Sequence, residues 1–427
     1  MTLEDFGVKR QETTLSNGAR LVLFEKKGAP LYLRAIFFAG SRFDPFGKEG
    51  AAHFLEHLIV AGTKNFRTKD KLASYIEKFG GIFNASTSAD SFDLNVAVGD
   101  PSDFDRIVEL FHEMLLEPLF DEKIIETERG SIFSEIGNMK SNPGSMIWEV
   151  WRNILFQDTV SGRSILGSEK SVGSIVRKDI IDFYNRRIVN GKMVFIASGG
   201  VKINDLKKEL ENKALVRGLR ERLSIEDLPV IREKNLLIEK YSGSNQIHLA
   251  FGFRSSSESH HDGPALDLLA TVVGGGRASL LQRKLRYETG LVYSVNARQQ
   301  SFCDSGSWVI KTSTSKSKFN EVLNVIVLEL KRIQHFGLSR EELEFAQDKI
   351  EKSKRMDMQT SGSWVGFHSL RELFRHDEVW TLSDYISEIR SVTPEKILTA
   401  AQKYFGSDKW YLAACGDIEE SDIKVDW

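Results

Sequence analysis

The chain has 427 residues, 41% of them apolar and 28% charged, which is typical of a globular protein with enough apolar material for two or more domains. Its 58 basic and 60 acidic residues leave a net charge of −2, which argues against a nucleic-acid-binding protein. The two cysteines, Cys303 and Cys415, form no disulfide framework, and such low cysteine usage fits a reducing compartment.

The amino-terminal residues, MTLEDFGVKR, carry two acids and lack the apolar stretch of a secretory signal. No apolar run approaches the ~18 residues that a transmembrane helix requires. We therefore expect a cytoplasmic protein that has no membrane partner, and a processed organellar form stays open.

The first half of the chain begins with two predicted strands followed by a helix. Residues 20–25 and 32–39 are rich in β-branched and aromatic side chains, as strands are. The loop GSRFDPFGKEG leads into a predicted helix that begins at about residue 49. A second helix is expected over 121–140, and MVFIASGG at 193–200 predicts another strand.

The second half repeats this order of elements about 215 residues later. Strands are predicted over 236–240 and 246–253, a helix over 264–273 and a strand over 410–417. The repetition indicates an internal duplication of an α+β unit, in which a mainly antiparallel sheet is backed by helices.

The duplication implies two domains of similar size. We predict a first domain over 1–218 and a second over 236–427, joined by a linker at 219–235. The linker segment is highly charged and contains Pro229, which favours a solvated connection over a binding surface.

The segment AAHFLEHLIVAG at 51–62 contains candidate metal ligands and a candidate general base. In a helix, His53 and His57 are four residues apart, so both imidazoles project from one face and can ligate one metal ion. Glu56 lies at the edge of that face, where it can deprotonate a water molecule as a general base. Because the helix is apolar almost all round, we expect it to be buried, and a metal ion would satisfy its polar groups. The alternative is a pair of core histidines that are hydrogen-bonded to carbonyl groups.

A catalytic zinc ion needs a third protein ligand and an open position for water. The predicted helix at 121–140 contains two glutamates, Glu128 and Glu135, which are two turns apart and share a face. The spacing alone leaves both glutamates open as the third ligand.

The order H-x-x-E-H is the inverted zinc motif, and here it stands in a context that resembles the family of pitrilysin, insulin-degrading enzyme and mitochondrial processing peptidase. The resemblance extends over essentially the whole length. It rests on three blocks, which read GSRFDPFGKEGAAHFLEHLIVAGT, FGGIFNASTSADSF and GGGRASLLQRKLRYETGLVYSV. The length is similar to that of the small members with a single pair of domains, in which the two domains form half of a clamshell chamber.

The resemblance implies one zinc ion per chain, held by His53, His57 and Glu135. Glu128 would then support the site from behind the ligands, and Glu56 would be the general base. The gap between His57 and Glu135 is one residue longer than in many members, so Glu128 is kept as the fallback ligand.

The same resemblance implies that Arg286 and Tyr293 hold the substrate carbonyl and the developing oxyanion, a role suited to a guanidinium and a phenol. They flank the Glu288–Thr289–Gly290 turn, which follows a predicted helix at 278–287. From the residues alone, Tyr293 reads as a strand aromatic in a core. The neighbouring Arg277 and Arg283 read as surface charges.

The segment GGIFNAST predicts a turn that enters a strand. By resemblance, this strand lies at a sheet edge, and Asn84 and Ala85 pair with the backbone of an extended peptide, which is β-augmentation. An ordinary hairpin is the alternative. Elsewhere, His260 and His261 lie in a polar loop that would hold a metal only weakly.

These expectations together describe a zinc metalloendopeptidase that cuts unstructured peptides. A single chain would supply half of the chamber, so a homodimer is expected and a heterodimer stays open. The alternative is a non-catalytic subunit, or one that is active only with a different partner, because some family members have lost the motif.

Overall fold

The chain forms two compact units. The computed structural model describes all residues apart from 1–2, 158, 214–233, 259, 375–378 and 426–427. The first unit comprises Met1–Ile136, Arg163–Ser224 and Arg355–Ser383. The second unit comprises Gly137–Gly162, Ile225–Lys354 and Asp384–Trp427. The predicted linker at 219–235 lies outside the described residues except for its last two positions.

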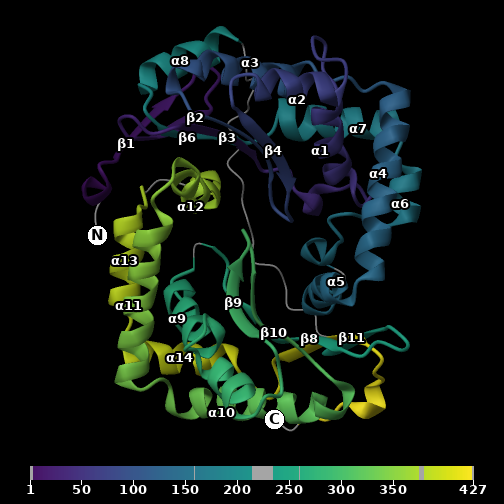
Figure 1. The fold of residues 1–427 in the computed structure, drawn as a ribbon, viewed down its shortest axis with the longest axis vertical. Helices are drawn as coiled ribbons and strands as arrows, with labels where there is room; N and C mark the ends of the chain where they lie inside the picture. The colour runs from purple at the N-terminus through teal and green to yellow at the C-terminus, as the bar shows by residue number, and fades with distance from the viewer. Residues whose placement is uncertain (1–2, 158, 214–233, 259, 375–378, 426–427) are drawn as a thin grey trace. The chain divides into compact units, whose positions relative to one another are not determined.

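The first unit contains a six-stranded sheet in the order β1-β2-β6-β3-β5-β4 (Figure 1). The strands are β1 (Lys9–Thr14), β2 (Arg20–Glu25), β3 (Leu31–Phe37), β4 (Ile82–Thr87), β5 (Phe92–Val98) and β6 (Met193–Gly199). The helices are α1 (Ala51–Ala61), α2 (Lys69–Glu77), α3 (Phe104–Leu116), α4 (Glu122–Ser141, whose last turn belongs to the second unit), α6 (Glu169–Ser174), α7 (Arg177–Tyr184), α8 (Ile203–Asn212) and α12 (Ser361–Phe374).

The second unit contains a five-stranded sheet in the order β7-β11-β8-β10-β9. The strands are β7 (Leu236–Lys240), β8 (Ile247–Ser255), β9 (Val295–Ser301), β10 (Gly306–Thr314) and β11 (Trp410–Gly416). The helices are α5 (Pro143–Phe156), α9 (Gly263–Gly274), α10 (Phe319–Phe336), α11 (Arg340–Asp357), α13 (Leu382–Arg390) and α14 (Pro394–Tyr404).

The two sheets confirm the predicted duplication and the α+β fold class. The order β2-β6-β3-β5-β4 recurs as β7-β11-β8-β10-β9, with each strand in the equivalent position. In each sheet one pair is parallel, β2 with β6 and β7 with β11, while the other pairs are antiparallel. Both sheets are therefore mainly antiparallel, as predicted from the separated runs of strands and helices.

The two halves of the sequence exchange one helix each. Helix α12 comes from the second half, yet it packs on β2, β3 and β6 of the first sheet (Figure 1). Helix α5 comes from the first half and packs on β7, β8 and β11 of the second sheet. Hydrophobic periodicity reveals that a helix has an apolar face, but it does not reveal which sheet covers that face, so this exchange was not predicted.

Aromatic packing and a buried ion pair hold α12 on the first sheet. Phe24 of β2 stacks on His368 of α12 with a centroid separation of 4.3 Å, and it also stacks on Trp364 at 5.7 Å. The buried carboxylate of Glu372 accepts a hydrogen bond from Arg10 at 2.7 Å and another from Arg20 at 2.9 Å. Two guanidinium groups thus neutralise a charge that would be costly to bury alone.

None of the helices in the described part of the chain combines the length and the apolar character that crossing a bilayer requires.

We predict that Glu372→Ala lowers the free energy of unfolding by about 3–5 kcal/mol, because it leaves two arginines without their buried counter-ion. The matched control is Glu344→Ala, which breaks an exposed pair with Arg340 at 2.8 Å and is expected to cost less than about 1 kcal/mol. Urea-induced unfolding of both variants measures the difference. Equal losses in the two variants would show that the buried pair does not anchor α12.

Candidate metal centre

Helix α1 begins at a fixed place because Asp44 binds its first amides. The Asp44 carboxylate accepts hydrogen bonds from the backbone N–H of Gly50 at 2.7 Å and of Ala52 at 2.8 Å. Gly50 has φ +97°, and a Cβ there would lie 2.7 Å from the carbonyl oxygen of Leu166, so only glycine fits. A carboxylate at this end also complements the helix dipole.

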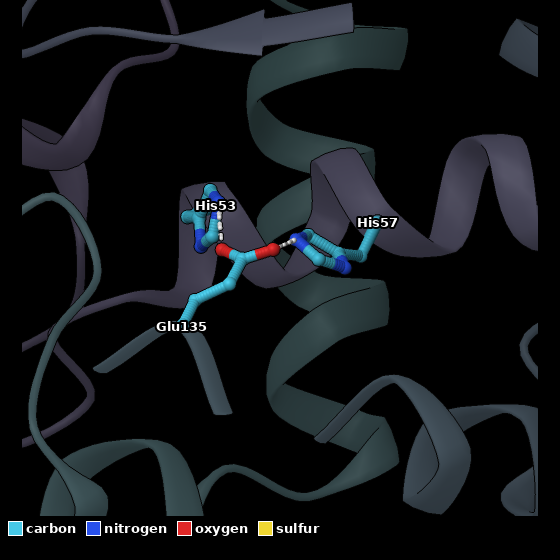
Figure 2. A group of neighbouring side chains, drawn as sticks. All are labelled: His53, His57 and Glu135. Carbon is cyan, nitrogen blue, oxygen red and sulfur yellow. Dashed lines mark ion pairs between the residues drawn. The ribbon is translucent and has the colours of Figure 1, made fainter. Parts of the chain in front are cut away.

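The histidines of α1 point toward one carboxylate of α4 (Figure 2). His53 Nε2 lies 3.6 Å from Glu135 Oε2, and His57 Nε2 lies 3.5 Å from Glu135 Oε1. One ligand atom from each residue falls within 4.8 Å of the others. The predicted set of His53, His57 and Glu135 is therefore brought together by the fold.

The separations within this set fit a zinc ion. Zinc bonds of about 2.0–2.1 Å in tetrahedral geometry place neighbouring ligand atoms about 3.4 Å apart. Each imidazole lies at about this separation from the Glu135 carboxylate, His53 from Oε2 and His57 from Oε1. Burial, followed by the neighbouring His57, lowers the pKa of His53 to about 4. His53 is therefore neutral at physiological pH, which is the form that binds a metal. Two imidazoles and one carboxylate also leave a fourth position open.

Glu128 occupies a different place from Glu135. Its Oε2 lies 2.9 Å from Nδ1 of His57, the ring nitrogen on the side away from Glu135. This hydrogen bond is the main reason why the pKa of Glu128 is lowered. A carboxylate on Nδ1 fixes the tautomer that exposes the Nε2 lone pair, as is common behind metal-binding histidines. The geometry thus favours Glu135 as the ligand and Glu128 as its support.

Glu56 lies on the same helix, half-buried, beside the histidines. Burial raises its pKa above the usual value, while the hydroxyl of Thr87 and the imidazole of His57 act in the opposite direction. A carboxyl group with a raised pKa is suited to carrying a proton between a water molecule and a leaving group. The nearness of Thr87 to Glu56 was not predicted, although Thr87 is two residues from Ala85 on β4 and therefore lies on the same face, which meets α1.

Strand β4, which carries the predicted peptide-binding residues, is an edge strand among the strands described. It pairs with β5 on one side, with Asn84 opposite Asn95 and Ala85 opposite Leu94. Asn84 is exposed, and Ala85 packs partly against the core that contains α1. The edge of β4 therefore offers backbone groups for pairing beside the helix that bears the histidines.

Arg286 and Tyr293 lie in the second unit, whereas the histidines lie in the first. The predicted helix at 278–287 is largely a π-helix, Gln282–Glu288, and Arg286 belongs to it. The guanidinium carbon of Arg286 lies 5.1 Å from the ring centroid of Tyr293, whose side chain is 80% exposed. The interpretation of Tyr293 as a core aromatic is therefore wrong.

Arg277 and Arg283 are exposed, as predicted, and Arg283 pairs with Glu288 at 3.8 Å.

His260 and His261 form a second group with Asp262, which the sequence analysis did not include. The carboxylate of Asp262 already binds Lys403 at 2.6 Å and the Tyr404 hydroxyl at 2.8 Å. A lysine at this distance competes with a metal ion, which agrees with the expectation of weak binding at most.

Family models match most of the chain. The model described as insulinase (peptidase family M16) matches residues 29–169, and the model described as the peptidase M16 inactive domain matches residues 174–350. An uncharacterised zinc protease of Streptomyces coelicolor is 26% identical, over 93% of this chain and 87% of that protein. The mitochondrial-processing peptidase subunit beta of Mus musculus is 27% identical, over 96% and 85% respectively.

Solved structures agree in fold. The crystal structure of a protease from Helicobacter pylori superposes with a TM-score of 0.85 at 20% sequence identity, covering 96% of this chain and 99% of that one. The paired α+β units, the inverted zinc motif and the matching models lead to one assignment: the chain belongs to the M16 family of peptidases, as a member with a single pair of domains.

Proposed function

We propose that this chain is a zinc metalloendopeptidase that hydrolyses peptide bonds in unstructured peptides. The observation that carries the proposal is the convergence of His53, His57 and Glu135 on one point, with Glu56 on the same helix. A structural role alone has no need for two imidazoles and two carboxylates in this arrangement.

The residues divide the chemistry between them. A bound zinc ion would polarise the scissile carbonyl and acidify a water molecule. Glu56 accepts the proton of that water during attack and returns it to the leaving amine, for which a raised pKa is favourable. Glu128 holds the imidazole of His57 in the ligating tautomer through the 2.9 Å contact.

We assign substrate binding to β4 and to the Arg286–Tyr293 pair. An extended peptide that pairs with the edge of β4 is bound by main-chain hydrogen bonds, including those to Asn84 and Ala85. Such binding depends little on the side chains of the peptide. The exposed phenol of Tyr293 and the guanidinium of Arg286 donate hydrogen bonds to the developing oxyanion. These two roles follow from the family resemblance and from the contact between the two side chains.

A homodimer is the proposed assembly, in which the zinc-binding unit of one subunit works with the Arg286–Tyr293 unit of its partner. The alternative is a subunit that requires a different chain, and the murine relative at 27% identity is itself named as a subunit. The complete metal group in this chain favours catalysis by the purified chain over a purely structural role.

The third ligand is tested by metal content. Purified wild-type protein is expected to hold about one zinc ion per chain, and Glu135→Gln is expected to lose it, because a neutral amide is a poor zinc ligand. Glu128→Gln should weaken zinc binding only about 10–100-fold, as expected for a group that orients a ligand. Glu126→Gln, an exposed change on the same helix, is the control. Loss of zinc in the Glu128 variant alone would show that Glu128, and not Glu135, is the third ligand.

The general base is tested by Glu56→Gln. This variant is expected to keep its zinc, while its turnover of an unstructured peptide falls about 10²–10⁴-fold, because an amide cannot accept the proton. Turnover and zinc content are measured on the same sample, with Glu126→Gln again as the control. A zinc-loaded variant that is as active as the wild type would refute the assignment. Absence of cleavage by the zinc-loaded wild-type chain would favour the subunit that requires another partner.

The oxyanion donor is tested by Tyr293→Phe, which removes one hydroxyl from an exposed ring. Turnover should fall about 10²–10³-fold, as it does when one donor of an oxyanion hole is removed. Tyr287→Phe is the matched control, since its ring also lies near Arg286, at 5.6 Å, and is 55% exposed. Steady-state kinetics of the two variants measure the difference. A loss below about threefold for Tyr293→Phe would contradict a contact made in the transition state.

A further inference from the structure

The second sheet carries two cations on one face near its edge strand. Arg298 of β9 stands opposite Val309 of β10, and Lys311 follows two residues later on β10. Because residues two apart on a strand point to the same face, Arg298 and Lys311 share a face of the sheet. This is the face on which α5 packs, since Val309 belongs to the same apolar cluster as Ile147 and Ile154 of α5.

Both cations contact one indole ring of α5. The guanidinium carbon of Arg298 lies 3.9 Å from the ring centroid of Trp148, and Nζ of Lys311 lies 4.6 Å from it. Lys311 also donates a hydrogen bond to the carbonyl oxygen of Gly144 at 2.9 Å. The indole and the carbonyl thus hold two like charges close together without neutralising either one.

No carboxylate among the described residues forms an ion pair with Arg298 or Lys311. Burial lowers the pKa of Arg298, and burial together with the neighbouring Arg298 lowers the pKa of Lys311. The first sheet differs, because Arg34 of β3, on the face that α12 covers, pairs with Asp93 at 3.3 Å. The second sheet therefore lacks, within the described chain, the internal counter-ion that the first sheet has.

The position of Arg298 makes it accessible to a ligand. Its guanidinium is partly buried against Trp148, but the residue as a whole is exposed, and β9 is the edge strand of the second sheet among the strands described. An extended peptide that lies along such an edge brings its own charged groups to the side chains of that strand. A guanidinium binds carboxylates strongly, since its donors match the two oxygens.

We propose that Arg298, held against Trp148 and supported by the charge of Lys311, binds a carboxylate of the peptide substrate. The site therefore rests on the proposed peptidase function, but it belongs to the second unit and uses none of the residues of the metal centre. The carboxylate belongs either to the carboxyl terminus of the peptide or to an acidic side chain. The predicted consequence is a preference for peptides that carry a carboxylate over the same peptides without one.

The test measures binding without cleavage, by fluorescence anisotropy on full-length, metal-free Glu56→Gln protein. Three short peptides with a fluorescent label at the amino terminus are compared: one uncharged with a free carboxyl terminus, the same peptide amidated, and an amidated version with one glutamate. The first, the third or both should bind about tenfold more tightly than the amidated neutral peptide, as one charge-assisted contact predicts. The peptide that gains affinity identifies the source of the carboxylate.

Arg298→Gln and Lys311→Gln, each added to this background, should reduce or abolish the difference. Arg277→Gln removes an exposed positive charge from the same unit and should leave the difference in peptide affinity unchanged. Equal affinities of the parent protein for the three peptides would overturn the proposal. A difference in affinity that persists in both the Arg298 and the Lys311 variants would also overturn it. So would a difference that is lost to the same extent in the Arg277→Gln control. Because no cleavage is involved, a failure of the proposed peptidase function would appear separately, in the turnover of the wild-type protein.

Discussion

The placement of two imidazoles on an apolar helix, one buried and one half-buried, is the constraint on which the rest of the first unit depends. Polar groups on such a helix must find partners, or the helix is destabilised. Glu128 satisfies one ring nitrogen of His57, and Glu135 approaches both rings from the same helix, α4. The start of α1 is in turn held by Asp44, whose two hydrogen bonds to backbone amides set where the histidines lie. The candidate metal site is thus built from groups that neighbouring elements of the fold hold in place.

Much of this could be predicted from the sequence, because the signals were local. β2 and β7 lie at the predicted residues, and α1 lies within the helix predicted from about residue 49, since short apolar segments and a continuous apolar helix are strong patterns. The spacing of His53 and His57 also determines their shared face. The choice between Glu128 and Glu135 could not be made from spacing, because both lie on one face and only the packing of α4 against α1 distinguishes them. Asp44 and Thr87 were missed for the same reason, since each acts on α1 from a separate loop or strand.

The two sheets share a topology but differ in chemistry. The first holds the candidate metal group next to its edge strand β4, and its Arg34 is neutralised by Asp93. The second holds an exposed tyrosine and arginine pair and a cation pair on Trp148. A duplicated framework can therefore keep its core positions while its polar positions diverge, since core residues are constrained by packing and surface residues are not.

The exchange of α12 and α5 has a consequence for biosynthesis. The six strands of the first sheet are complete once residue 199 has left the ribosome, but the helix that covers Phe24 and its neighbours begins only at Ser361. Until then, an apolar sheet face stays open to water on a nascent chain, where such faces are prone to aggregation. At about 5–20 residues per second, this interval lasts on the order of ten seconds or more. The first sheet therefore cannot be covered until α12 has been synthesised. A chaperone that binds the open face during translation would protect it from aggregation in this interval.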